Sequence, residues 1–153
     1  PSAMAKLDPF GGEETFNADP ARVFAFLTNI EEMSKTIPDL VSAEKIDDRT
    51  LKAVVKPGFT FLRSTMRLTI RMEPDEANRT AVMKVQAEGL GVGMNTESTM
   101  RITPDANGAR VQWTASVTDM RGLISLAPTS LVRGAAEKTV KDGFDALRKK
   151  LET

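Results

Sequence analysis

The chain contains no cysteine, no histidine and no tyrosine among its 153 residues. Without cysteine it has no disulfide, no thiolate nucleophile and no cysteine metal site, and a reducing cytoplasm is compatible with this composition. Without histidine it has no Ser-His-Asp or Cys-His nucleophile, no histidine metal cluster and no histidine general base. Any catalysis would have to use carboxylates, lysine, arginine or hydroxyl groups. We expect no metal site and no cofactor.

The chain also lacks net charge and long hydrophobic runs. Lys plus Arg and Asp plus Glu number 21 each, so no general electrostatic attraction to nucleic acid is expected. No apolar run approaches the roughly 20 residues that cross a bilayer. Length and composition suit one soluble globular domain. Residues 1–9, with Pro1-Ser-Ala before Met4, are predicted to be a tag or tail, and residues 10–153 to form the domain.

Three glycines alternate with other residues in the segment EGLGVGMNTESTM, residues 88–100. A dinucleotide-binding fingerprint needs G-x-G-x-x-G between a strand and a helix, so that the helix N-terminus meets the pyrophosphate. Here the spacing is G-x-G-x-G, no Walker lysine follows, and both flanking segments alternate like strands. The glycines are therefore predicted to form a hairpin turn or a bend with close backbone approach, and not a phosphate loop.

Periodicity predicts two short helices early in the chain. Asp19-Pro20 provides a capping carboxylate followed by proline in the first turn. Val23, Leu27 and Ile30 then follow at helical spacing. A second short helix is expected over 31–35, ending before the next proline.

From Leu40 onward the period changes to two. Leu51, Ala53 and Val55 share one side of a strand, and several later segments repeat this alternation. Asn107-Gly108 is a strong hairpin signal. One apolar and one polar face predict an antiparallel sheet that is covered on one side.

The final segment, about Ser125 to Leu151, is predicted to be one long helix. Its apolar stripe is formed by Leu131, Ala135, Val140, Phe144, Leu147 and Leu151. Basic residues on this helix would suit a membrane surface, but acidic residues are interleaved with them, which favours a solvated face.

This order of elements resembles the START/Bet v 1-like (SRPBCC) superfamily and, within it, the CoxG family of carbon monoxide dehydrogenase subunits. The resemblance lies in DPARVFAFLTNIEEMSKTIPDLVSAEKID, MRLTIRMEP, EGLGVGMNTESTMRITPDANGARVQW and the closing helix. It implies an α+β helix-grip fold, with a curved antiparallel sheet of six or seven strands wrapped around the C-terminal helix and two short helices after the first strand. The family's Ile-Pro-Gly segment reads Ile37-Pro38-Asp39 here, and Phe24 replaces its first-helix tryptophan.

The resemblance also implies a deep apolar cavity between sheet and helix. Eight methionines, many at inward strand positions, suit an adaptable apolar pocket, although each one alone would also suit a packed core. Inward polar groups such as Thr96, Ser98 and Asp119 would orient a ligand or bond within the sheet. The predicted ligand-binding residues are Phe59, Phe61, Met66, Leu68, Met83, Val85, Met94, Ser98, Met100, Trp113, Val117, Asp119, Leu123 and Leu131.

The mouth of this cavity is predicted at one end of the sheet. Phe59 and Phe61 follow a Pro-Gly turn, and Met120, Leu123 and Leu126 precede or open the long helix. These two segments would form a gate with exposed apolar surface, although Phe59 would also serve as a packing anchor.

Two functions follow as hypotheses. The first is a non-catalytic carrier or binding domain for a hydrophobic small molecule or lipid, accessory to a molybdenum hydroxylase such as carbon monoxide dehydrogenase. It would be cytoplasmic, at most peripheral to the inner face of the membrane in transient contact, with no nucleic-acid partner. The alternative is a cyclase- or hydrolase-like enzyme, which needs two titratable groups converging on the cavity. Alternation places only Asp119 there, so the carrier is favoured.

Overall fold

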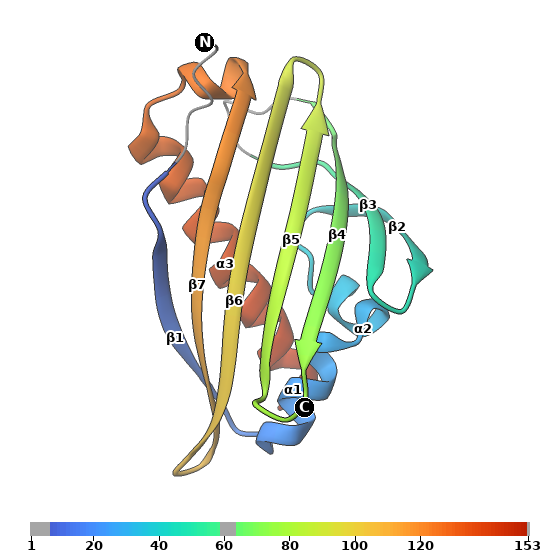
Figure 1. Ribbon diagram of the computed structural model, residues 1–153, viewed down its shortest axis with the longest axis vertical. Helices are drawn as coiled ribbons and strands as arrows, with labels where there is room; N and C mark the ends of the chain where they lie inside the picture. Colours follow the sequence, from blue (N-terminus) through green and yellow to red (C-terminus); the bar gives the residue numbers. More distant parts are fainter. Residues whose placement is uncertain (1–6, 59–63, 153) are drawn as a thin grey trace.

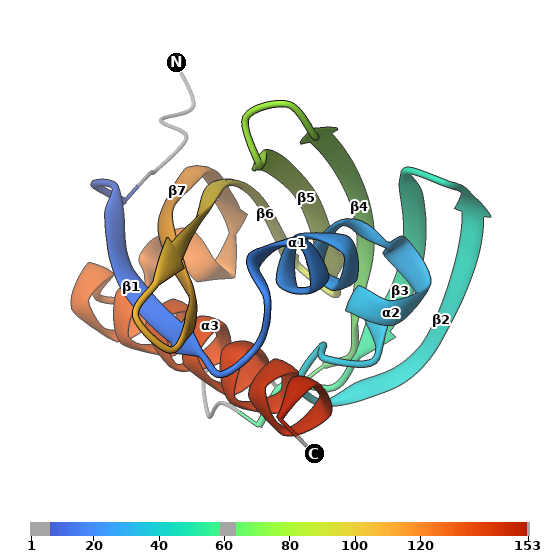
Figure 2. The same ribbon diagram turned by 90° about the horizontal axis from the view of Figure 1, so that it is seen from below.

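A computed structural model describes residues 7–58 and 64–152 of the chain. Seven antiparallel strands form one sheet in the order β1-β7-β6-β5-β4-β3-β2, and the sheet curves around a long C-terminal helix (Figures 1 and 2). This confirms the predicted helix-grip fold. The elements are β1 (Phe10–Phe16), α1 (Pro20–Thr28), α2 (Ile30–Ser34), β2 (Leu40–Asp47), β3 (Thr50–Val55), β4 (Met66–Asp75), β5 (Thr80–Gly89), β6 (Val92–Asp105), β7 (Gly108–Gly122), the 3-10 helix η1 (Leu123–Leu126) and α3 (Thr129–Leu151).

Side-chain caps define the two short helices. Asp19 Oδ1 accepts a hydrogen bond from the Ala21 amide at 3.0 Å, at the start of α1. Asn29 Oδ1 accepts from the amides of Glu31 and Glu32, both at 3.0 Å, and so ends α1 and begins α2. Each cap satisfies amides that have no partner inside the helix. The predicted helix pair is confirmed, with α2 displaced by one residue.

Alternation along the strands sets the two faces of the sheet as predicted. On β3, Leu51, Ala53 and Val55 are buried while Lys52 is exposed. On β4, Met66, Ile70 and Met72 are buried on the same face. The buried face is the concave one, toward α1 and α3 (Figure 2). The convex face meets solvent, which is the usual arrangement for a one-sided antiparallel sheet.

The glycine-rich segment forms the β5–β6 hairpin, as the flanking alternation predicts. Gly89 pairs with Val92, so Leu90 and Gly91 make the turn. Gly91 has φ 70°, a left-handed conformation that glycine adopts without steric cost. In the β6–β7 hairpin Asp105 pairs with Gly108, so the turn consists of 106–107 and lies one residue before the predicted Asn107-Gly108.

The long helix begins later than predicted. Residues 123–126 form η1, and α3 starts at Thr129 instead of Ser125. Pro128 lacks an amide hydrogen and has an extended ψ of 132°, so it separates the two segments. Ser125 Oγ donates to the Gly122 carbonyl at 2.7 Å and ties η1 back to β7.

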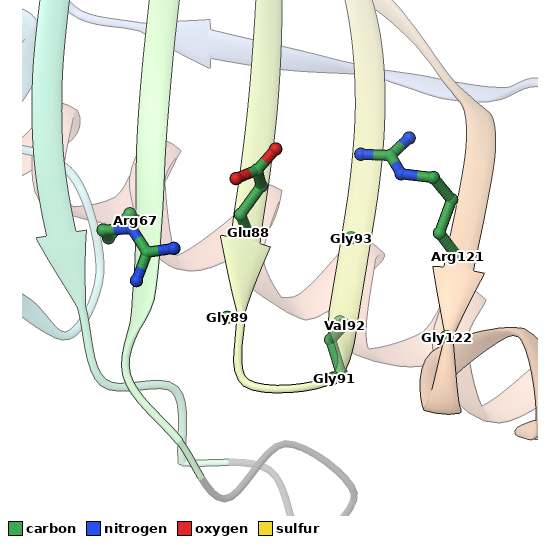
Figure 3. A pocket seen from close by; sticks show the side chains of 8 residues that line it. All are labelled: Arg67, Glu88, Gly89, Gly91, Val92, Gly93, Arg121 and Gly122. Carbon is green, nitrogen blue, oxygen red and sulfur yellow. The ribbon is translucent and has the colours of Figure 1, made fainter.

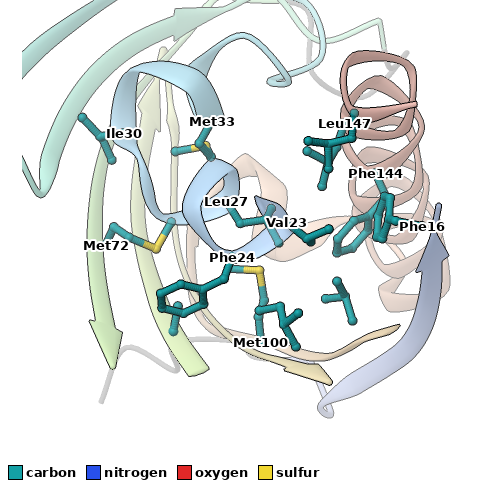
Figure 4. Close-up of a cluster of buried hydrophobic side chains, with 14 of the residues drawn as sticks. Phe16, Val23, Phe24, Leu27, Ile30, Met33, Met72, Met100, Phe144 and Leu147 are labelled. Carbon is teal, nitrogen blue, oxygen red and sulfur yellow. The ribbon is translucent and has the colours of Figure 1, made fainter. Parts of the chain in front are cut away.

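The best-packed part of the core lies under α1 and α2. Figure 4 shows side chains of both short helices facing those of α3 and the sheet. Val23 is 0% exposed, and Phe24 and Leu27 are buried beside it. Phe16 and Phe144 lie with ring centroids 6.1 Å apart and join β1 to the second half of α3. This end of the molecule is closed by bulky side chains from every surrounding element.

Candidate functional site

A cavity of about 330 Å³ lies between α3 and the concave face of the sheet. Nine of the predicted ligand-binding residues lie in its wall, on four neighbouring strands. They are Met66, Leu68, Met83, Val85, Met94, Ser98, Met100, Trp113 and Val117. Inward alternation on β4, β5, β6 and β7 places them there, since adjacent strands keep their inward residues in register.

Small residues on α3 make room for the cavity. Ala135, Ala136, Thr139 and Gly143 face it, between Val132 on one side and Phe144 on the other. A Cβ atom added at Gly143 would lie 3.7 Å from the Thr36 carbonyl oxygen, so the helix passes close to the end of α2 there. Sequence analysis missed Ala136, Thr139 and Gly143, because small residues carry little of the apolar signal that marks a helix face.

The cavity meets solvent beside the segment that follows α2. Asp39 and Thr139 both line the cavity and are both exposed, so they mark its rim, with Pro38 and Pro57 next to Asp39. Of the described residues in the wall, only Asp39 has an ionisable side chain. Its φ of 58° is a left-handed conformation, which is uncommon for a residue other than glycine.

Charges across the rim are opposite in sign. Lys138 Nζ donates to Asp142 Oδ2 at 2.5 Å, and this pairing is the main cause that raises the pKa of Lys138. The charge of Asp39 raises the pKa of Lys138 further by a smaller amount. Lys138 and Asp39 therefore lie close enough to attract each other, and both are exposed to solvent. The rim is polar and the wall behind it is apolar.

Few side chains of the cavity wall carry a hydroxyl group, and these hydroxyls differ in whether they are hydrogen-bonded to nearby backbone. Thr36 Oγ1 donates to the Met33 carbonyl at 2.7 Å, and Thr139 Oγ1 donates to the Ala135 carbonyl at 2.9 Å. Both hydroxyls therefore form local hydrogen bonds to backbone carbonyls three or four residues earlier in the chain. Thr96 and Ser98 are half-buried neighbours on the inner side of β6 and line the cavity near its middle strands. With Ser116 on β7, they are the hydroxyl-bearing residues of the described strands that line the cavity.

Asp119 does not face the cavity, which corrects the inward orientation expected from alternation. The pairing of β6 with β7 shifts between Asn95 and Thr96, because Thr118 is an extra residue on β7. Such a bulge moves the following side chains to the opposite face. Asp119 consequently accepts a hydrogen bond from Asn95 Nδ2 at 3.3 Å and forms an ion pair with Arg121 on the convex face.

Of the predicted gate residues that the structure describes, Leu123 and Leu126 are exposed as predicted, but Met120 is not. Met120 is 1% exposed and packs with Leu7, Val117, Ile124 and Val132, and this cluster closes the end of the cavity. Leu7 belongs to the predicted tail, yet its amide donates to the Val117 carbonyl at 3.2 Å. Phe59 and Phe61 lie outside the described residues.

Leu123 and Leu131 are both exposed and neither lines the cavity. On α3 the inward row is Val132, Ala136, Val140 and Phe144, at steps of four residues. Leu131 lies about 100° around the helix from Val132 and so turns outward. Leu123 belongs to η1, of which only residues 125–126 were predicted to be part of the long helix, and its side chain is 68% exposed.

A second hollow, of about 350 Å³, lies on the convex face beside the β5–β6 turn. Arg67, Glu88, Gly93 and Arg121 form one row across four strands there, because each pairs with the next (Figure 3). The guanidinium of Arg121 occupies the space that a side chain at position 93 would fill, 2.8 Å from a Cβ added there. This hollow is open, polar and separated from the cavity by the sheet.

Within residues 7–58 and 64–152, no group of three or more acidic side chains is placed to hold a metal ion. None of the helices in the same ranges combines the length and the hydropathy that a membrane-spanning segment requires.

Comparisons with solved structures define the fold. A conserved protein from Geobacillus kaustophilus superposes with a TM-score of 0.86 at 19% identity, covering 95% of each chain. A START superfamily protein from Mycobacterium smegmatis gives 0.73 at 11% identity, covering 94% of this chain and 97% of that one. The protein Ara h 8.0201 gives 0.70 at 15% identity, covering 96% and 98%. The fold is therefore that of the START/Bet v 1-like superfamily.

The family follows from the sequence itself. The family model of CoxG, a carbon monoxide dehydrogenase subunit, matches residues 12–152. The chain belongs to this family, and the predicted resemblance is confirmed. No curated protein matches the chain.

Proposed function

We propose that this domain is a non-catalytic carrier that holds a hydrophobic small molecule or lipid between α3 and the sheet. The observation that supports this most directly is the apolar cavity of about 330 Å³. Well-packed interiors contain few voids larger than a water molecule, so an apolar void of this size needs a reason. Its volume lies at the lower end of the range for small-molecule sites.

The wall suggests how such a ligand would be oriented. The wall is largely apolar and includes six methionines, whose flexible side chains can adapt to an apolar body. Thr96 and Ser98 would hydrogen-bond to a polar group of the ligand near the middle of the cavity. Met66, Met83 and Met100 would contact its apolar part.

Family membership supports a finer proposal about the partner. The name of the CoxG family refers to carbon monoxide dehydrogenase. We infer that this chain is accessory to a molybdenum hydroxylase of that type and supplies or receives the ligand on the cytoplasmic side of the membrane. The proposal of a carrier does not depend on this partner.

A cyclase- or hydrolase-like enzyme is less well supported by the same cavity. General acid–base chemistry needs two titratable groups whose pKa values are pushed apart at one place. Asp39 lies at the exposed rim, and Asp119 lies on the other face of the sheet. Neither carboxylate is positioned to share a substrate with a second ionisable group inside the cavity.

Native mass spectrometry of protein purified without detergent tests the carrier. The expected result is a co-purifying hydrophobic molecule that is released on denaturation. A fluorescent hydrophobic probe should then compete for the same cavity.

A matched pair of substitutions locates the binding. Ala136→Phe fills the cavity from α3 and should weaken probe binding by roughly tenfold or more, because a phenyl ring would occupy the space of the ligand. Ala146→Phe makes the same change on the same helix at a half-buried position that does not line the cavity, and it should leave binding unchanged. Equal affinities in the two variants would show that the probe binds elsewhere.

A further inference from the structure

The described part of the cavity wall offers no positive charge to a ligand. Among its residues Asp39 alone is ionisable, and the other polar side chains are the hydroxyls described above. Those of Thr36 and Thr139 already donate to backbone carbonyls. An ionised group that enters an apolar site without a charged partner has a large desolvation cost. A charged headgroup would therefore have to stay at the rim while its apolar chain enters the cavity.

At the rim, the backbone of Asp39 is tied to the sheet. Its carbonyl accepts a hydrogen bond from the Lys56 amide at 3.0 Å, directly after β3. The residue is exposed, lines the cavity, and lies close enough to α3 for its charge to raise the pKa of Lys138. A negative charge is therefore held beside the opening, at the place where a charged headgroup would remain.

Lys138 does not cancel this charge, because it is shared between two carboxylates. Its Nζ donates to Asp142 Oδ2 at 2.5 Å, and this bond is the larger of the two influences on its pKa. Asp39 is the weaker partner. Two carboxylates against one ammonium group leave one negative charge in excess beside the opening.

The other basic residues nearby in the chain do not offset this excess either. Lys56 follows the inward residue Val55, so alternation turns its side chain toward the convex face. Lys35 and Lys141 are each paired with a carboxylate three or four residues away, at 3.2 and 3.7 Å. Of the charged side chains that the structure describes around the opening, Asp39 is the one that lines the cavity.

We propose that Asp39 makes the cavity selective against anionic amphiphiles, so that the ligand carries an uncharged polar group. This inference rests on the carrier function proposed above and names the class of ligand within it. Specificity often arises from an unfavourable contact with the wrong ligand, and like charges near a protein surface repel. A carboxylate would find no cation in the described wall and would meet Asp39 at the rim. An uncharged polar group can instead reach Thr96 and Ser98 inside.

Three amphiphiles with the same alkyl chain and different headgroups test this selectivity. Dodecanoate, dodecanol and dodecylamine would each compete with a neutral fluorescent probe at about pH 8, where the carboxylic acid is ionised and the amine is protonated. Wild-type protein should bind dodecanol roughly tenfold or more tighter than dodecanoate. High salt should narrow this difference, because screening weakens the repulsion at the exposed rim.

Asp39→Asn removes the charge with little change in shape, and asparagine is among the residues that best tolerate the left-handed backbone at this position. The variant should bind dodecanoate about three- to tenfold more tightly than wild type, dodecylamine more weakly by a similar factor, and dodecanol within about twofold. Opposite shifts for the two charged ligands identify an electrostatic effect, because a change in cavity shape would move all three affinities together. Lys138→Gln should weaken dodecanoate binding, since it removes the cation between the two carboxylates.

The control makes the same change of charge away from the opening. Asp48 has a side chain that is 93% exposed and does not line the cavity, so Asp48→Asn should leave all three affinities unchanged. Equal wild-type affinities for dodecanoate and dodecanol, unchanged selectivity in Asp39→Asn, or shifts of both charged ligands in one direction would each overturn the selectivity and leave the carrier intact. Absence of dodecanol binding by the wild type would contradict the carrier itself, and the selectivity with it.

Discussion

The two ends of the concave face use the same strand pattern and reach different outcomes. At the end under α1 and α2, inward residues such as Leu51 meet bulky side chains, and Leu51 is 1% exposed. Toward the other end, inward residues such as Leu68 and Met94 line the cavity and remain half-buried. The strands alternate equally well in both halves. The difference lies in what the helices contribute.

This contrast shows how a helix-grip domain combines stability with a void. Val23, Phe24 and Leu27 fill the space between α1 and the sheet (Figure 4). Ala135, Ala136 and Gly143 on α3 leave space instead. The packed end supplies the burial that holds the sheet curved, so the cavity end can remain unfilled. If that is correct, substitutions at the two ends should differ strongly in their cost.

The largest expected difference is between two leucines on adjacent strands. Leu51→Ala removes a fully packed side chain on β3 and should lower the free energy of unfolding by about 2–5 kcal/mol. Leu68→Ala, on β4 in the cavity wall, should cost about 1 kcal/mol or less, because the removed atoms already face open space and lose few contacts. Urea denaturation of both variants measures this comparison.

Similar losses at both positions would mean that the cavity end is packed as tightly as the other end. Probe binding provides the complementary measurement. Leu68→Ala should change probe affinity, since Leu68 lines the cavity, whereas Leu51→Ala should leave the affinity of the folded fraction unchanged because Leu51 lies outside it.

Much of the fold could be predicted because it rests on strong local signals. Asp19-Pro20 caps α1, alternation marks β3 to β7, and the glycines make the β5–β6 turn. The start of α3 was predicted too early, because residues 125–127 have helix-compatible side chains; Pro128, which lacks an amide hydrogen, ends this run, and η1 is tied back to β7 through Ser125.

The candidate site was predictable on the strands and less so elsewhere. Met66, Met83 and Met100 follow a period of two that holds without interruption, and all three line the cavity. Asp119 was misplaced because a bulge at Thr118 leaves no clear mark in the sequence. The α3 wall was missed for a different reason, since alanine and glycine define a cavity by the volume that they do not fill.

A smaller change in unfolding free energy is expected where the backbone of Gly122 contacts that of Gly91. Gly122→Ala would bring a Cβ atom within 2.1 Å of the Gly91 carbonyl oxygen at a φ of 73°. We expect a loss of more than about 1 kcal/mol in unfolding free energy. Gly134→Ala, in the exposed part of α3 with open space around it, should instead stabilise by about 0.5–1 kcal/mol. Thermal melts of the two variants in opposite directions would support this, and a neutral Gly122→Ala would contradict the close approach.

The smallest expected effect concerns Asp39, the ionisable residue at the rim. A φ of 58° is unfavourable for most side chains, so Asp39→Gly should relieve about 1–2 kcal/mol of backbone strain in the folded state. Glycine also gives the unfolded chain more conformational freedom, which offsets part of this stabilisation. We expect a net stabilisation of about 0.5 kcal/mol. Arg79→Gly, at the other described positive-φ residue that is not glycine (49°), should give a similar gain at the packed end.

If the rim carboxylate only faces solvent, Asp39→Gly should leave the affinity for a neutral probe within about twofold of wild type. A large loss of affinity with unchanged stability would instead assign Asp39 a direct part in holding the ligand, and would make the rim, as well as the apolar wall, a determinant of binding.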